Sequence, residues 1–160
     1  MERELSLEEQ VARLLLESGY SITTTESCTG GLLAGRLMNV PGISAAYKEG
    51  YITYSNEAKE KLLQVSHQTL EKYGAVSKET AYEMALGAAN AANADVALST
   101  TGIAGPDGGT PEKPVGLVYI GCCIKGEVTV EGHLFAGERA QVRVLAVEAA
   151  LQLAKRLLMK

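Results

Sequence analysis

The residue best suited to nucleophilic chemistry is Ser27, which lies in a short turn between a predicted strand and a predicted helix. The turn continues through Cys28, Thr29, Gly30 and Gly31. Backbone N–H groups at the start of a helix have no partner within the helix, so they can bind an anion or the oxyanion of an acyl-transfer intermediate. The same pattern is also typical of a plain helix cap, in which the hydroxyl of Ser27 or Thr29 accepts a backbone hydrogen bond.

A serine nucleophile needs a base, and the two histidines are poorly placed to supply one. His67 begins a predicted surface helix, and His133 lies in a predicted hairpin strand. Tyr54 and Lys59 are better candidates, because a strand ends at Tyr54 and the next helix carries Lys59. A lysine base must be neutral, which requires burial or cationic neighbours to lower its pKa from about 10.4 to roughly 7–8. The alternative is that Lys59 is solvated on its helix and Tyr54 lies at the rim of the core.

Two other kinds of residue near these positions have ambiguous roles. Cys28 is a rival nucleophile, because a helix N-terminus lowers the pKa of a thiol, but a small buried residue fits the pattern as well. Arg139 and Arg143 lie one turn apart at the start of the last predicted helix, where they could clamp a phosphate or carboxylate. Ordinary surface arginines are the alternative.

A long irregular loop runs from Thr101 to Pro114 and contains Gly102 and Gly105. Like the turn at Ser27, it leaves the end of a predicted strand, so both segments are expected at the same edge of the sheet. Loops of this length inside a small domain are usually functional. The sequence has no Gly-x-Ser-x-Gly elbow, Walker phosphate loop or Gly-x-Gly-x-x-Gly fingerprint, which disfavours the common serine hydrolases, nucleoside triphosphatases and dinucleotide-binding proteins.

The elements that must position these residues follow from hydrophobic periodicity and capping signals. Helices are predicted at about 6–18, 32–38, 57–63, 66–73, 77–92 and 138–157, and strands at about 21–26, 47–54, 95–101, 115–124 and 127–135. Helices that alternate with strands, followed by one hairpin, predict a three-layer α/β/α fold with a mixed sheet of about five to six strands. We expect a single domain over residues 1–160.

Composition excludes several classes of protein. The 160 residues are 46% hydrophobic with a formal net charge of −4 and no block of like charges, which argues against binding to nucleic acid. No apolar run is long enough for a membrane span or a signal peptide, so a cytoplasmic location is expected. Three cysteines without zinc-ligand spacing predict neither a disulfide framework nor a structural metal. We expect no cofactor, and a small domain with a site near its edge is expected to form a homo-oligomer.

Several blocks of the sequence together resemble the CinA C-terminal domain family. They cover essentially the whole chain in order and comprise 25–31 (TESCTGG), 50–59 (GYITYSNEAK), 74–77 (GAVS), 102–109 (GIAGPDGG), 113–116 (KPVG) and 137–139 (GER). Longer members of the family carry an additional N-terminal domain, whereas this resemblance concerns the C-terminal domain alone.

The resemblance implies an activity and a set of site residues. Stand-alone members are nicotinamide-nucleotide amidohydrolases, which convert nicotinamide mononucleotide and water to nicotinate mononucleotide and ammonia in pyridine nucleotide recycling. The family's catalytic serine, tyrosine and lysine fall on Ser27, Tyr54 and Lys59, and no metal is needed. Cys28, Thr29, Gly30 and Gly31 are expected to contact the reacting amide. The substrate phosphate is expected to contact some of Thr101, Gly102, Gly105, Arg139 and Arg143. Thr100-Thr101-Gly102 stands where a related enzyme has Ser-Gly.

Two alternatives remain open from the sequence. The same glycine loops would suit a non-catalytic module that binds or senses a nucleotide. An amidohydrolase with Cys28 as its nucleophile is the other alternative.

Overall fold

The computed structural model describes residues 3–160 and has five strands and six α-helices, in the order that the sequence predicts. The helices are α1 Leu7–Ser18, α2 Leu32–Met38, α3 Asn56–Leu63, α4 His67–Tyr73, α5 Lys78–Ala92 and α6 Arg139–Leu158, with a short 3-10 helix at Ile43–Ala45. The strands are β1 Ile22–Glu26, β2 Tyr51–Ile52, β3 Val96–Gly102, β4 Leu117–Ile124 and β5 Glu127–Leu134. None of the described helices is long and apolar enough to cross a membrane.

The strands form one mixed sheet in the order β2-β1-β3-β4-β5. Strand β1 is parallel to both of its neighbours, β2 and β3, whereas β3, β4 and β5 pair antiparallel. In the register of the parallel strands, Glu26 lies opposite Thr100 of β3 and Ile52 of β2. The last residue of β1 therefore lies between two parallel strands, and Ser27 leaves the sheet at that point.

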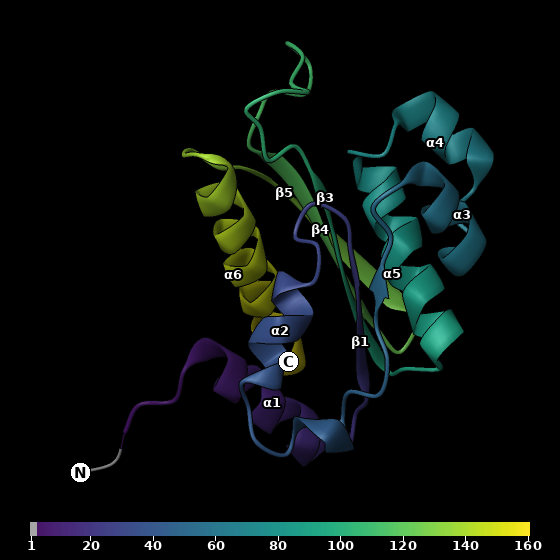
Figure 1. Ribbon diagram of the computed structural model, residues 1–160. Coiled ribbons are helices and arrows are strands. Elements are labelled where there is room, and N and C mark those ends of the chain that lie inside the picture. Colours follow the sequence, from purple (N-terminus) through teal and green to yellow (C-terminus); the bar gives the residue numbers. More distant parts are fainter. Residues whose placement is uncertain (1–2) are drawn as a thin grey trace.

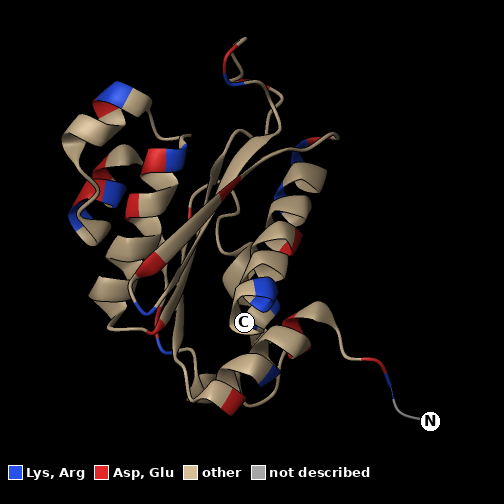
Figure 2. Cartoon of the chain, turned by 180° about the vertical axis from the view of Figure 1, so that it is seen from behind, with Lys and Arg blue, Asp and Glu red and all other residues tan. Residues whose placement is uncertain are grey.

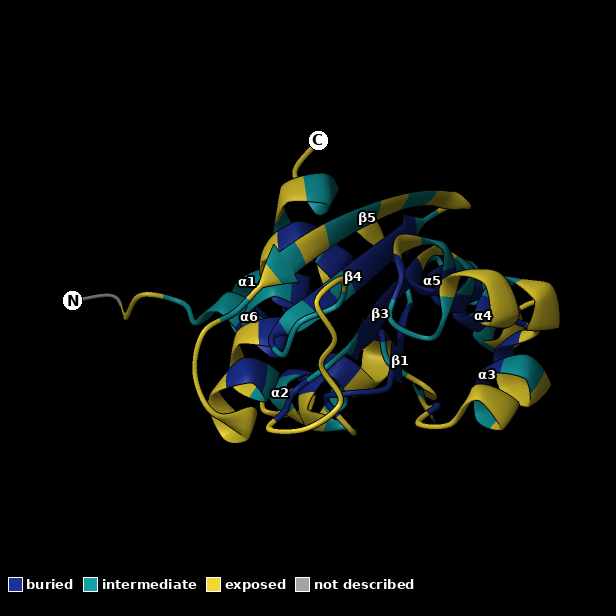
Figure 3. Cartoon of the chain, turned by 90° about the horizontal axis from the view of Figure 1, so that it is seen from above, coloured by how far each residue is buried: buried dark blue, intermediate teal, exposed yellow. Residues whose placement is uncertain are grey.

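Helices cover both faces of the sheet, which gives three layers (Figure 1). Helices α1, α2 and α6 pack together on one face, and α3, α4 and α5 pack on the other. Each face has its own apolar core, and the central strands β1 and β3 between them are buried, whereas the edge strand β5 is partly exposed (Figure 3). This arrangement confirms the predicted α/β fold with a mixed sheet.

Local signals predicted most helix starts. The side chains of Ser6 and Glu9 form a capping box at the start of α1, and the hydroxyls of Ser55 and Ser77 accept hydrogen bonds from the N–H groups of Ala58 and Thr80 at the starts of α3 and α5. On the helices, acidic and basic residues are interspersed and do not form patches of one charge (Figure 2).

The predicted strand at 47–54 was too long, because only Tyr51–Ile52 pairs as a strand, with an isolated bridge between Tyr47 and Ile22. Between Tyr47 and Tyr51, side-chain hydrogen bonds to β1 take the place of backbone pairing. The hydroxyl of Thr23 donates to the carbonyl of Glu49 at 2.7 Å, and Tyr47 bonds the hydroxyl of Thr24 at 2.8 Å. The Tyr47 hydroxyl lies over Gly50, where a Cβ atom would come within 1.8 Å of it.

Helix α3 packs closely against α5 at Gly87. A Cβ atom at this position would lie 2.1 Å from the backbone carbonyl oxygen of Leu63. Because the obstacle is backbone, α3 as a whole would have to move to admit a side chain. Gly87 therefore fixes the distance between α5 and the helix that carries Lys59.

We predict that Gly87→Ala lowers the free energy of unfolding by about 1–3 kcal/mol, although alanine favours helices, because of overpacking against α3. Gly35→Ala is the matched control, since Gly35 also lies within a helix and no atom beyond its chain neighbours and its own helix backbone lies within 4 Å of its ideal Cβ position. The control is expected to raise stability by about 0.5–1 kcal/mol. Urea denaturation of both variants measures the two effects, and a stabilising Gly87→Ala would show that the helix contact is not tight.

Candidate active site

Strand β1 delivers Ser27 to the edge of the sheet. The backbone N–H of Ser27 donates to the carbonyl of Thr100 at 3.0 Å, so the turn begins as a continuation of the sheet pairing. Only 8% of Ser27 is exposed. Its hydroxyl is therefore held in one place with little access to bulk water.

Lys59 is fully buried, and its amino group reaches Ser27. Nζ lies 3.2 Å from Oγ of Ser27, 2.8 Å from the carbonyl oxygen of Thr53 and 3.4 Å from that of Tyr54. Its exposed fraction is 0%, which overturns the alternative of a solvated helix residue. Lys59 therefore lies within hydrogen-bond distance of Ser27, as a base for this serine must.

Burial lowers the pKa of Lys59 to about 8. Its three polar contacts are all to uncharged oxygen atoms, and no carboxylate among residues 3–160 contacts the ammonium group. About a tenth of a lysine with this pKa is neutral at pH 7, against less than about 0.1% of an ordinary one. Lys59 can therefore accept the proton of the Ser27 hydroxyl directly.

Tyr54 lies at the mouth of the site and does not connect Ser27 to Lys59. The residue is 63% exposed, and its hydroxyl lies 3.4 Å from Nη2 of Arg139. Only its backbone carbonyl contacts Lys59. Tyr54 thus contacts Lys59 through its backbone carbonyl and Arg139 through its hydroxyl, whereas Ser27 and Lys59 contact each other directly.

Cys28 is a poor candidate for a nucleophile. It is 7% exposed, and burial raises the pKa of its thiol to about 11. A thiol becomes a strong nucleophile only as the thiolate, which this environment disfavours. The start of α2 at Leu32 also leaves Cys28 outside the helix whose N-terminus was expected to activate it.

The expectation that Gly30 and Gly31 donate to an anion or oxyanion was wrong. The carboxylate of Glu26 accepts the N–H groups of Gly31, Leu33 and Ala34, and the N–H of Gly30 donates to the carbonyl of Ser27. Thr29 does not cap the helix through its hydroxyl either, since that hydroxyl donates to Glu26 at 2.6 Å. A side chain of the protein itself already satisfies the helix N-terminus.

The two arginines have different positions from those expected for a pair of phosphate ligands. Arg143 does not line the cleft, and its Nε donates to the carbonyl of Cys28 at 3.0 Å and its Nη2 to that of Thr29 at 3.1 Å. Arg139 lines the cleft, and its Nη1 donates to the carbonyl of Gly105 at 2.8 Å. The forked donors of Arg143 thus hold the protein backbone, and Arg139 alone borders the cleft.

A cleft of about 260 Å³ opens beside Ser27, near the lower end of the range for small-molecule sites, about 300 Å³. Of the predicted site residues, the cleft is lined by Ser27, Cys28, Tyr54, Lys59, Thr101, Gly102, Gly105 and Arg139, but not by Thr29, Gly30, Gly31 or Arg143. The remaining lining residues are Ala75, Val76, Ile103, Ala104 and Asp107. These five were not predicted, although Ala75, Val76 and the segment 103–107 lie within motifs that carried the family resemblance.

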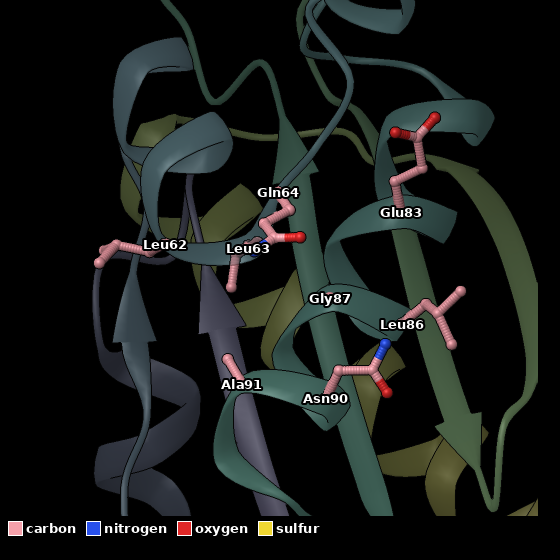
Figure 4. A pocket seen from close by; sticks show the side chains of 8 residues that line it. All are labelled: Leu62, Leu63, Gln64, Glu83, Leu86, Gly87, Asn90 and Ala91. Carbon is pink, nitrogen blue, oxygen red and sulfur yellow. The ribbon is translucent and has the colours of Figure 1, made fainter.

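A second hollow, of about 340 Å³, lies between α3 and α5 (Figure 4). It is lined by Leu62, Leu63, Gln64, Glu83, Leu86, Gly87, Asn90 and Ala91. Its one ionisable group, Glu83, accepts hydrogen bonds from the N–H of Ser66 and the hydroxyl of Thr69. The hollow contains no nucleophile with a base, so the smaller cleft at Ser27 is the candidate active site.

We predict a pH dependence of stability that belongs to Lys59 alone. Between its folded pKa of about 8 and its ordinary value of 10.5, the unfolded chain binds a proton that the folded protein does not. The free energy of unfolding of the native protein, measured relative to that of Lys59→Met, should therefore rise with pH across this window by up to about 3 kcal/mol, because the other titrating groups are common to both proteins. Urea denaturation of both proteins at several pH values measures the difference, and parallel pH profiles would contradict a lowered pKa.

Comparison with known proteins gives the chain a family. The profile of the CinA C-terminal domain matches residues 4–158. A Clostridium novyi protein named as competence-damage inducible is 58% identical over 158 residues, which cover 98% of this chain and 38% of that protein. The chain thus spans less than half the length of such relatives. A CinA superfamily protein from Klebsiella pneumoniae has a solved structure with a TM-score of 0.92 and 37% identity, covering 96% of both chains. A competence/damage inducible protein from Agrobacterium tumefaciens, at 38% identity and full coverage of both chains, has a TM-score of 0.89. The chain belongs to the CinA C-terminal domain family.

Proposed function

We propose that the protein is an amidohydrolase that converts nicotinamide mononucleotide and water to nicotinate mononucleotide and ammonia. One observation carries the enzymatic part of the proposal, namely the 3.2 Å contact between the hydroxyl of Ser27 and the buried amino group of Lys59. A serine whose hydroxyl meets a lysine of lowered pKa is an activated nucleophile. The substrate is the one implied by the family resemblance, which the names of the relatives do not mention.

In the first half of the reaction, Ser27 forms an acyl-enzyme. Neutral Lys59 takes the hydroxyl proton as Oγ of Ser27 attacks the carboxamide carbon. The carbonyl oxygen becomes an oxyanion, which collapses as the C–N bond breaks. Lys59 returns the proton to the departing nitrogen, which leaves as ammonia.

In the second half, water releases the product. Lys59, neutral again, takes a proton from a water molecule that attacks the acyl carbon. The bond from the carbon to Oγ breaks, and Lys59 returns the proton to Ser27. The products are the free carboxylate and the original enzyme, so the same pair serves both halves.

The cleft also suits the remainder of the substrate. Arg139 borders it with a guanidinium group whose Nη1 is anchored on Gly105, and such a group binds phosphate through forked donors. Two lining residues of the cleft are hydrogen-bonded to each other, because the hydroxyl of Thr101 donates to the carbonyl of Ala75 at 2.8 Å. We propose Arg139 as the phosphate ligand. Thr29, Gly30, Gly31 and Arg143 do not line the cleft and are not proposed as substrate contacts.

The direct test is the release of ammonia from nicotinamide mononucleotide by the native protein and its variants. Ser27→Ala is expected to lower kcat at least ~10³-fold and Lys59→Ala at least ~10²-fold. Cys28→Ala is the control and should stay within about threefold of the native rate, because its thiol is protonated. An active Ser27→Ala together with an inactive Cys28→Ala would favour the cysteine alternative. Binding of the nucleotide without turnover by the native protein would favour a sensing module.

The activity is expected to rise with pH. Only neutral Lys59 accepts a proton, so kcat/KM should increase about tenfold per pH unit below its pKa of about 8 and level off above it. Measurement from about pH 6.5 to about pH 9.5 covers the transition. A rate that is flat or falls across this range would show that Lys59 is not the base.

Tyr54→Phe separates two roles for the tyrosine. Direct transfer between Ser27 and Lys59 predicts that kcat changes less than about tenfold, with the larger effect on KM through the lost contact with Arg139. A loss in kcat as large as that of Lys59→Ala would instead support the proton-transfer role that the family resemblance implies. Steady-state kinetics at a pH above the lysine transition distinguishes the two results.

A further inference from the structure

Glu26, the residue before Ser27, is 1% exposed and forms four hydrogen bonds through its carboxylate. Oε1 accepts the hydroxyl of Thr29 at 2.6 Å and the N–H groups of Gly31 at 3.2 Å and Leu33 at 2.8 Å. Oε2 accepts the N–H of Ala34 at 3.0 Å. The carboxylate therefore caps the N-terminus of α2, where a negative charge is favoured by the helix dipole.

The network extends to the neighbouring strand. The single hydroxyl proton of Thr29 goes to Glu26, so the 2.8 Å contact between the hydroxyls of Thr29 and Thr100 must use the proton of Thr100. The carbonyl of Thr100 in turn accepts the N–H of Ser27. Glu26 thus connects both ends of the turn to β3.

Arg143 holds the same turn from the other direction. Its guanidinium group binds the carbonyl oxygens of Cys28 and Thr29, which fixes the two peptide planes. The C=O and N–H of a trans peptide point in opposite directions. The N–H of Thr29 must therefore point away from Arg143.

Most backbone N–H groups of the turn have an acceptor within the protein. The N–H of Ser27 donates to the carbonyl of Thr100, and the N–H of Gly30 donates to the carbonyl of Ser27. The N–H of Gly31 donates to the carboxylate of Glu26, and the N–H of Leu32 donates to the carbonyl of Thr29. Within residues 3–160, the N–H groups of Cys28 and Thr29 have no protein acceptor at hydrogen-bond distance. Cys28 directly follows the nucleophile and lines the cleft, whereas Thr29 is buried and does not line it.

We propose that Glu26 is a positioning residue of the reaction: together with Arg143, its carboxylate holds the turn so that the N–H of Cys28 binds the oxyanion. The proposal rests on Ser27 being the nucleophile of the proposed function. It also explains why the helix N-terminus does not serve the substrate phosphate, since Glu26 occupies that position with a negative charge of its own.

The test uses a fluorophosphonate, which reports on the nucleophile and the oxyanion donors without any amide substrate. Oγ of Ser27 attacks phosphorus, the P–F bond breaks, fluoride leaves, and the serine proton passes to Lys59. The phosphoryl oxygen takes the place of the oxyanion. Intact mass spectrometry gives the labelling rate, and peptide mapping confirms Ser27 as the site.

Glu26→Gln is expected to label at least ~10-fold more slowly than the native protein, because the amide NH₂ faces a donor N–H and the turn relaxes. Thr29→Val, which removes only the hydroxyl link, should give a smaller decrease in the same direction. Glu8→Gln is the matched control, since Glu8 is also buried and contacts α2 through Arg36 but lies away from the turn. The control should label within about twofold of the native rate.

A second readout separates positioning from general loss of structure. The pH midpoint of labelling, which belongs to Lys59, should stay near 8 in Glu26→Gln, and with nicotinamide mononucleotide the variant should lose kcat while KM changes less than about threefold. Labelling of Glu26→Gln within twofold of native would overturn the proposal, as would a failure of the native protein to label at Ser27. Native labelling without turnover of the nucleotide would contradict only the proposed substrate and leave the role of Glu26 supported.

Discussion

The burial of one lysine amino group against a serine hydroxyl is the interaction on which the site depends. Lys59 has no exposed surface, and its Nζ contacts only the Ser27 hydroxyl and two backbone carbonyl oxygens. Burying a charged ammonium group without a carboxylate partner is unfavourable, so burial lowers the pKa and increases the fraction of the neutral form that a base requires. The surrounding structure must hold the lysine in place, because a water-filled gap or an acidic neighbour would restore the charge.

Strand β1 provides that support through its three consecutive threonines. The hydroxyls of Thr23, Thr24 and Thr25 bond the carbonyl of Glu49, the hydroxyl of Tyr47 and the hydroxyl of Thr53, respectively. Thr53 also donates its N–H to the carbonyl of Glu26, and its own carbonyl accepts from Lys59. The segment that leads to the lysine is therefore attached along its length to the strand that leads to the serine. Gly87 sets the position of α3 from the other side by allowing it to approach α5 closely.

The sequence predicted the parts of this structure that local signals encode. The serine caps, the hairpin at Lys125-Gly126 and the order of helices and strands are such signals, and they sufficed for the fold class, for Ser27 at the end of a strand and for Lys59 on a helix. The errors concern contacts between residues far apart in the chain. Arg143 reaches carbonyls 114 and 115 positions away, and no sequence pattern distinguishes it from Arg139, which faces the cleft. The role of Glu26 was not predicted, because a carboxylate five to eight residues before the backbone N–H groups that donate to it is not a usual helix cap.

The pKa of the Lys59 amino group tests the central claim most directly. Titration of the intact protein by NMR, with the lysine Nζ resonances assigned by comparison with Lys59→Met, measures it without any assumption about the substrate. A value of about 8, which shifts when the neighbouring hydroxyl is removed in Ser27→Ala, is the predicted result. A value near 10.5, unchanged in Ser27→Ala, would show that the amino group is charged and solvated and would contradict its role as the base.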